Sequence, residues 1–417
     1  MTQTVLNHVN AMPAPTWHRL HMNETQVEIP DGLAPAHLVR VEADMELFGK
    51  EDAFDKALQG AQDAWEQTAA YEKTKDYAEQ KAKLYEEKEF FDVAARSRYQ
   101  RRADEIEDSL SLAKSFETGT GNEAYEFLRN AASKPLVLLA GANTEKEATI
   151  RVPGVGGYMN VAAIDLIVPD GLEFSLTLAT DSIEPGTGLT GTSLRVFAGR
   201  GSDVKITRFQ TLGTEVCDID DMGLFLDTDA HVTVEQTVLG GERAYTGLAS
   251  DLRGENASIE IDLHYLGHKD QVRDFNYSIR HHGPKSQSEL HANGVLAGKS
   301  KKTLRGTIDL IRGACGAEGE EDETVLLVDE GVENKTVPVI LCNEDDVMGN
   351  HGATIGHVNA DQLFYLACRG LNKEVAEDMF VQSALERAAL TAPDEEIREG
   401  VLNYARTLIE DFQEVDL

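Results

Sequence analysis

The sequence has few cysteines, few aromatic residues and a deficit of positive charge. Its four cysteines form no Cys-x-x-Cys pair, which excludes a zinc ribbon or a local iron–sulfur ligand loop. We expect Cys217, Cys315, Cys342 and Cys368 to be buried small side chains rather than disulfides. Lysine and arginine number 39 against 73 aspartates and glutamates, a formal net charge of -34. Such a surface repels phosphates, so we expect no nucleic-acid and no membrane partner.

Long apolar runs and catalytic signatures are also missing. No run approaches the length of a transmembrane helix, and the first residues lack the basic and apolar parts of a signal peptide, so we expect a cytoplasmic protein. There is no Walker lysine motif and no Gly-x-Ser-x-Gly elbow. The acidic run 218–223 places Met222 where a calcium loop needs an oxygen ligand. The sequence therefore predicts no catalytic residue and indicates that the protein is not an enzyme.

The first 134 residues of the 417 have a helical pattern. Residues 61–118 contain no glycine and no proline and are rich in strong helix formers. An apolar stripe with helical spacing begins just before them, at Phe54, Leu58, Ala61 and Trp65. We predict a long helical hairpin or coiled coil over about 51–118, which we interpret as a solvated spacer rather than a partner-binding arm.

Residues 135–348 have a different texture, with short β-branched runs separated by Gly, Asp, Asn or Pro. Several runs alternate with period two, as in Val232-Val234 and Ile259-Ile261-Leu263. No helical pattern between them is long enough for a crossover, which argues against a doubly wound α/β fold. A β-sandwich or barrel and a parallel β-helix both fit, and periodicity favours the solenoid only slightly.

Residues 349–417 return to a helical pattern. Asn359 to Gln362 have the form of a capping box, and Gly370 fits the position just after a helix end. The sequence therefore predicts a core between an N-terminal region (1–134) and a C-terminal helical region (349–417).

Five histidines lie close together in the sequence, within an expected strand and turn: His264, His268, His281, His282 and His291. A metal site needs three or four ligands at about 2.1 Å from one point. Four residues of strand span about 13 Å, so these side chains cannot easily share an ion. We do not expect a metal site in this group.

The segment Pro338–Leu371 carries a combined motif that resembles the C-terminal signature of the SufB/SufD family of iron–sulfur cluster assembly proteins. The matching residues are Asp345-Asp346-Val347, His351-Gly352-Ala353-Thr354-x-Gly356, Gln362-x-Phe364-Tyr365-Leu366 and Arg369-Gly370. Upstream, a second block follows the family order, with His281 or His282, Pro284, Ser288, Gly294-Val295-Leu296, Gly306-x-Ile308 and Leu326-Leu327. The His-Gly-Ala-Thr form is similar to SufD. SufB-like chains have a cysteine where this chain has the acidic run 320–323.

The resemblance implies a mainly β fold, a right-handed parallel β-helix flanked by N-terminal and C-terminal helical regions. It also implies a non-catalytic scaffold that binds the ATPase SufC and pairs with SufB. In the family, the C-terminal helical segment binds SufC. The resemblance therefore implies a SufC-binding segment here that includes Gln362, Phe364, Tyr365, Arg369 and Gly370. Asp345, Asp346, Gly352, Thr354 and Gly356 are the motif residues with an expected structural role.

The family's interface histidine matches His351, which the resemblance implies contacts iron or a nascent cluster together with a SufB cysteine. Imidazole beside a thiolate is a plausible iron ligand pair. The alternative interpretation is that His351 only fixes a turn. We expect no stably bound cofactor on this chain alone and at most a transient iron–sulfur cluster at a shared interface.

Several family residues are replaced. Leu341 stands at an acidic position, Gly349-Asn350 at Cys-Ser, and Ala292-Asn293 at a lysine before Gly-Val-Leu. Two other functions stay open at this point: a homodimeric SufB-like scaffold that works without a separate SufB, and a β-helix enzyme acting on carbohydrates.

Overall fold

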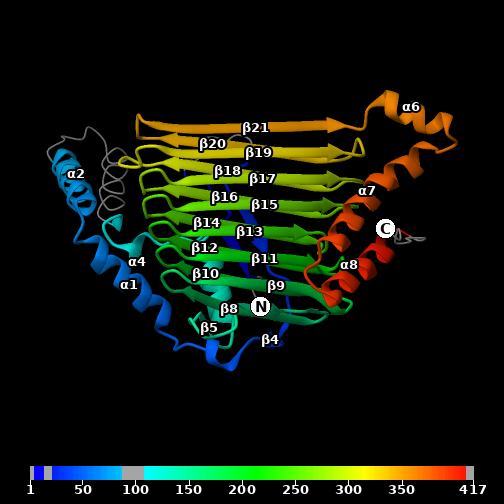
Figure 1. Ribbon diagram of the computed structural model, residues 1–417. Helices are drawn as coiled ribbons and strands as arrows, with labels where there is room; N and C mark the ends of the chain where they lie inside the picture. The colour runs from blue at the N-terminus through cyan, green and yellow to red at the C-terminus, as the bar shows by residue number, and fades with distance from the viewer. Residues whose placement is uncertain (1–3, 14–20, 87–107, 410–417) are drawn as a thin grey trace.

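The computed structural model describes residues 4–13, 21–86 and 108–409, and its centre is a parallel β-solenoid (Figure 1). Successive long strands alternate between two sheets, so each coil contributes one strand to each sheet. The even sheet contains β8 Tyr158–Val168, β10 Gly188–Ala198, β12 Val216–Leu226, β14 Arg243–Leu252, β16 Val272–His281, β18 Lys301–Leu310 and β20 Glu333–Cys342. The odd sheet contains β6 Glu147–Arg151, β9 Glu173–Glu184, β11 Asp203–Thr211, β13 His231–Val238, β15 Ser258–Gly267, β17 Gln287–Leu296, β19 Ala317–Leu327 and β21 Val347–His357.

Each long strand stacks in register on its counterpart one coil later. Met222 on β12 pairs with Leu194 on β10, which pairs with Ile164 on β8. Since partners in a parallel ladder point to the same side, equivalent side chains form columns along the solenoid. The predicted mainly β fold with helices at both ends is confirmed, and the solenoid, not the sandwich, is correct.

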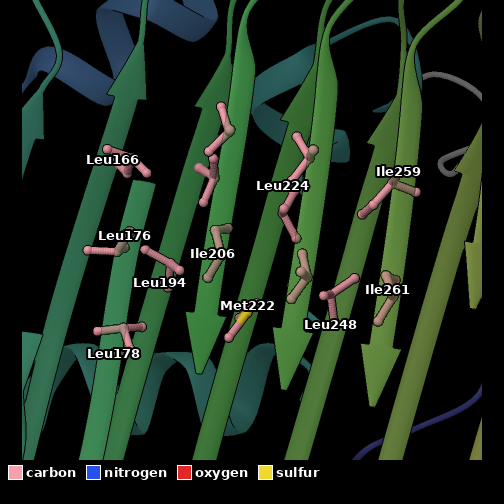
Figure 2. Close-up of a cluster of buried hydrophobic side chains, with 14 of the residues drawn as sticks. Leu166, Leu176, Leu178, Leu194, Ile206, Met222, Leu224, Leu248, Ile259 and Ile261 are labelled. Carbon is pink, nitrogen blue, oxygen red and sulfur yellow. The ribbon is translucent and has the colours of Figure 1, made fainter. Parts of the chain in front are cut away.

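Alternation along the strands creates the core. Ile259, Ile261 and Leu263 on β15 are buried, while the residues between them are half-exposed. Figure 2 shows such side chains from both sheets meeting between them. Each aliphatic side chain buried in this way contributes about 1.5–3 kcal/mol.

The N-terminal region contains strands as well as helices. Its elements are β1 Val5–Val9, β2 Thr25–Glu28, β3 Ala34–Pro35, β4 Arg40–Glu42, η2 Met45–Leu47, α1 Ala53–Trp65, α2 Ala69–Glu86, α4 Leu112–Ser115, α5 Asn122–Ala131, β5 Leu136–Leu139 and β7 Gly154–Val155. The purely helical prediction for 1–134 is wrong for β1 to β4, which lie within that range. Their formation depends on tertiary packing, because β1 and β2 bury Leu6, Val9 and Val27 against α5 and the even sheet. Of the hairpin predicted over 51–118, residues 87–107 lie outside the described residues.

Helix α1 is fixed on the even sheet by its apolar stripe. Phe54 and Leu58 pack against Phe197 and Phe225, whose rings stack with centroids 5.2 Å apart. The guanidinium of Arg195 lies over the Phe54 ring at 4.2 Å. The N-terminal stripe is therefore a docking face for the solenoid.

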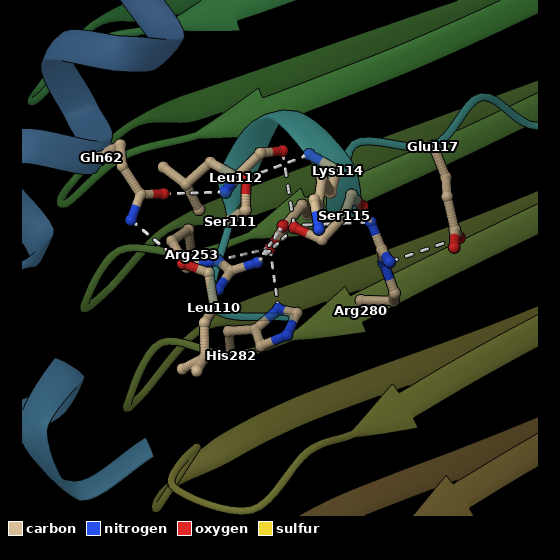
Figure 3. Close-up of polar contacts among 11 residues, drawn as sticks. Gln62, Leu110, Ser111, Leu112, Lys114, Ser115, Glu117, Arg253, Arg280 and His282 are labelled. Atoms are coloured by element: carbon tan, nitrogen blue, oxygen red, sulfur yellow. Dashed lines mark hydrogen bonds and ion pairs between the residues drawn. The ribbon is translucent and has the colours of Figure 1, made fainter. Parts of the chain in front are cut away.

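Helix α4 is joined to the solenoid by polar contacts (Figure 3). The Arg280 guanidinium donates to the Ser115 carbonyl at 2.7 Å and pairs with Glu117 at 3.3 Å. Asp251 binds Arg253 at 2.6 Å and His282 at 2.8 Å. These charge-assisted contacts hold the end of the N-terminal region against β14 and β16.

The C-terminal helices are α6 Ala360–Cys368, α7 Lys373–Leu390 and α8 Glu395–Leu408. Val381, Leu385 and Val401 of α7 and α8 pack on Phe209 and Leu266 at one end of the odd sheet. Helix α6 projects beyond the last coil (Figure 1). Among the described residues, no helix combines the length and the apolar character that a bilayer span requires.

The helical region begins at α6, not at residue 349 as predicted. Residues 347–357 form β21 in register with β19, so the chain continues as a strand where a helical region was predicted. The two predicted helix ends are confirmed. The Asn359 side chain accepts from the Asp361 amide at 2.9 Å, and Gly370 has φ 91° just after α6.

Candidate functional site

The last coil, formed by β20 and β21, leaves the solenoid open at this end. Each is the terminal strand of its sheet, so one backbone edge of each has no strand partner among the described residues. Most of β21 is exposed, including the apolar Met348 at 54% and Ile355 at 44%. An uncapped solenoid end with exposed strand edges is a surface for pairing with another chain.

His351 lies in the middle of β21, not in a turn. It pairs in register with Glu321 of β19, whose side chain is buried inside the solenoid. His351 therefore faces the interior from the open coil, where it remains exposed. A side chain at the neighbouring Gly352 would meet the tip of the exposed Asp322 side chain, which can move aside.

A buried polar network lies one coil below His351, around Glu323 of β19. The Glu323 carboxylate accepts from the Tyr265 hydroxyl at 3.0 Å and the Thr336 hydroxyl at 2.6 Å, and it pairs with the Lys302 ammonium. Lys302 and Glu323 are almost completely buried, and burial lowers the pKa of the Lys302 ammonium despite Glu323 beside it. Three donors thus satisfy this carboxylate.

Glu321, two residues earlier on the same strand, has no hydrogen-bond or ion-pair partner within the described part of the chain. It is only 3% exposed. Burial, and then the charge of Glu323, raise the pKa of its carboxyl to about 7. Its carboxylate occupies the space that a side chain on Gly306 of β18 would fill.

Sequence reasoning missed both glutamates as site residues. The acidic run 320–323 was noted only as a replacement of family residues. The signal that could have found them is the period-two alternation of β19, in which Gly319, Glu321 and Glu323 fall on the buried side. Charged residues at inward strand positions are rare and mark special sites.

Asp345 and Asp346 lie in the turn between β20 and β21. The Gly316 amide donates to the Asp346 carbonyl at 2.6 Å, and the Asp345 amide donates to the Glu344 carboxylate at 2.9 Å. Both aspartate side chains are exposed. Thr354 and Gly356 lie on β21, where both are exposed.

The predicted docking residues lie on and just after α6. Phe364 is 71% exposed and Tyr365 is 56% exposed. The Arg369 guanidinium lies over the Tyr365 ring at 4.9 Å. Gln362 belongs to the same helix, and Gly370 ends it. The structure thus places these residues on a projecting helix, apart from His351 on β21.

The five clustered histidines are separated by the fold. His264 contacts Arg387 of α7 at 3.2 Å, and His282 binds Asp251. His281 is buried between the Ser286 and Ser288 hydroxyls at 2.8 and 2.9 Å. Within the described ranges, no three His, Cys, Asp or Glu side chains converge as metal ligands.

The cysteines differ from expectation. Cys217 is buried as predicted, and burial raises the pKa of its thiol to about 12. Cys315, Cys342 and Cys368 are exposed, because they fall in the turn between β18 and β19, at the end of β20 and at the end of α6. All four are free thiols.

Comparison with known proteins places the solenoid in a family. The model of the SUF system FeS cluster assembly SufBD core domain matches residues 156–384, more than half of the chain. The chain is 28% identical over 180 residues to the iron-sulfur cluster assembly protein SufD of Escherichia coli K12, covering 43% of this chain and 42% of that one. It is 27% identical over 154 residues to SufD of Bacillus subtilis, covering 37% and 35%.

A SufBD family protein of Mycobacterium bovis is 32% identical over 144 residues, covering 34% of this chain and 17% of that protein. The alignments span less than half the length of these relatives. The predicted resemblance is confirmed, and its SufD-like character agrees with the two SufD matches. The chain belongs to the SufB/SufD family of iron–sulfur cluster assembly proteins.

Proposed function

We propose that this chain is a non-catalytic scaffold subunit of a SUF complex, which binds a SufC-type ATPase and pairs with a SufB-type subunit. The observation that carries the proposal is the open last coil beside a projecting helix, both within or next to the family's core domain. Scaffold function needs two separate partner surfaces, and these two features supply them.

Helix α6 is the proposed SufC surface. Phe364 and Tyr365 expose large aromatic side chains, and such residues commonly anchor interfaces. Asn359 and Gly370 fix both ends of the helix, so it is ordered before a partner binds. Preformed order lowers the entropic cost of association.

The last coil is the proposed surface for the SufB-type subunit. The backbone edges of β20 and β21 can pair with strands of another solenoid, which also covers Met348 and Ile355. His351, which is exposed on the last coil, would then lie at the contact. Iron and sulfide assembled at such a contact are cargo, and a neutral imidazole is a suitable iron ligand.

Substitution of two α6 residues tests the SufC surface. Phe364→Ala combined with Tyr365→Ala should abolish co-purification of the SufC-type ATPase from the same organism. Deletion of residues 359–417 is a poorer test, because it would uncover Phe209 and Leu266 of the solenoid. The matched control is Met45→Ala, which removes a side chain that is 80% exposed on η2.

The control should bind the ATPase as the unmodified chain does. Undiminished binding by the Phe364 and Tyr365 double variant would show that α6 does not dock SufC. The open coil could instead pair with a second copy of this chain. The mass of the purified assembly distinguishes such a homodimer from a pair with a SufB-type subunit. If the chain alone cleaves an acidic polysaccharide, the claim that this subunit is non-catalytic is wrong.

A further inference from the structure

The surroundings of Glu321 differ from those of Glu323, the other buried carboxylate on β19. In register below Glu321 lies Leu290, and opposite it lies Gly306. Above Gly306 the even sheet carries Pro338, which has no amide hydrogen to donate. Below Gly306 lies Tyr277, whose hydroxyl already donates to Gln236 at 2.6 Å.

His351 is consequently the one polar side chain that stacks in register on Glu321. Backbones of adjacent coils are about 4.8 Å apart, so the imidazole and the longer carboxylate can converge on a point between them. Lys302 pairs with Glu323 and donates to Thr336, so its charge acts on Glu321 only from beyond ion-pair distance. An ionised carboxylate in this position without a donor or cation is costly.

We propose that Glu321 and His351 form a ligand pair for one divalent first-row metal ion at the open end of the solenoid, iron(II) in the proposed function. This inference rests on the proposed function and deepens it by naming a second ligand on this chain. Carboxylate oxygen and imidazole nitrogen together suit iron(II). Two ligands leave most of the coordination sphere for water and for the subunit that covers the last coil, in agreement with the absence of a three-ligand site within the described ranges.

The pair also explains the local sequence. Gly306 leaves room for the carboxylate, and the alternation of β19 directs Glu321 inward while Glu320 points outward. A purely structural carboxylate would be expected to have donors like those of Glu323. Glu321 instead lies one coil below the exposed His351, at the open end of the solenoid.

Anaerobic titration of the full chain with iron(II), followed by calorimetry, tests the pair. We expect one ion per chain, with binding weakened at least tenfold by Glu321→Gln and by His351→Ala. Glu320→Gln removes the neighbouring outward carboxylate and should leave binding unchanged. Thermal unfolding of each variant checks that it is folded, and Glu321→Gln should be at least as stable as the unmodified chain because it removes an unpartnered charge.

The outcomes separate this inference from the scaffold function. If His351→Ala weakens binding and Glu321→Gln does not, the histidine acts without Glu321 and the inference is wrong. If the unmodified chain binds no iron(II) at millimolar concentration, the ligand pair is also wrong. Neither result affects the proposal that SufC binds α6. That proposal is wrong only if the Phe364 and Tyr365 double variant still binds the ATPase.

Discussion

The middle coils and the last coil of the solenoid have the same backbone and opposite surroundings. Strand β12 is buried at every position, because the core covers one face and the N-terminal region covers the other. Strand β21 has the same length and is exposed at most positions. The two strands differ in what covers them. A middle coil is stabilised by its neighbours, whereas the last coil has an edge that no further coil covers.

Two adjacent lysines on β18 allow a buried ion pair to be compared with an exposed one, and here we expect the largest difference in stability. Lys302→Met would leave the buried Glu323 without its cation, at an expected cost of about 3–5 kcal/mol of unfolding free energy. Lys301→Met removes only an exposed pair with Glu333 at 2.9 Å and should cost less than about 1 kcal/mol. Denaturant unfolding measures both values.

Adding Glu323→Gln to Lys302→Met should restore part of the loss, since the uncompensated charge is then gone. Equal stability of the Lys301 and Lys302 single variants would mean that the interior next to the open coil is already solvated.

Truncation of aliphatic side chains compares the two regions directly. Leu248→Ala in β14 should cost about 3 kcal/mol, because the surrounding core cannot fill the cavity. Ile355→Ala in β21 should cost less than about 1 kcal/mol, since nearly half of that side chain is already exposed. The measurement is the shift of the urea midpoint at unchanged slope. Similar costs at the two positions would contradict the contrast between closed and open coils.

Acid should weaken the closed coils through His281. Burial, with His282 nearby, lowers the pKa of this imidazole to about 4, whereas an unfolded histidine titrates near 6.5. Between these values the unfolded chain binds more protons, so stability falls as the pH drops. His281 should account for about 2 kcal/mol lost between pH 8 and pH 5.

Unfolding curves at the two pH values should show this loss reduced in His281→Gln. His291→Gln, at a part-exposed position on β17, should keep the original pH dependence. An unchanged profile in the His281 variant would show that the buried imidazole does not control acid stability.

The smallest expected change in stability comes from an exposed residue of β21. Met348→Asp should alter the free energy of unfolding by less than about 0.5 kcal/mol. It should nevertheless weaken pairing with the SufB-type subunit at least tenfold, because an unpaired charge would be buried at the contact. Sedimentation of mixed subunits measures the affinity, with Ile183→Asp, 57% exposed on β9, as the control. Equal affinities of the two variants would place the contact elsewhere.

Local patterns predicted much of the fold. The alternation of Ile259, Ile261 and Leu263 identified strands, and Asn359 and Gly370 identified both ends of α6, since each signal acts within a few residues. The choice between sandwich and solenoid needed the family resemblance, because alternation does not encode which strands pair. Strands β1 and β2 were missed for a related reason, since distant residues bury them.

The candidate site was predicted only in part. Motif residues identified His351 and α6, but residues 349–357 around His351 were predicted to belong to the helical region and form part of β21. Glu321 and Glu323 share a strand and a buried face, yet Glu323 accepts from three donors and Glu321 has none among the described residues. That difference depends on Tyr265, Lys302 and Thr336, which come from other coils.

Hydrogen exchange of the backbone amides of β21, measured with and without the SufB-type subunit, tests the claim that the open coil is a partner surface. In the chain alone, β21 amides should exchange far faster than those of β12. The partner should slow exchange in β20 and β21 and leave β12 unchanged. Exchange in β21 that is as slow as in β12 without a partner, or equally fast with one, would contradict the account.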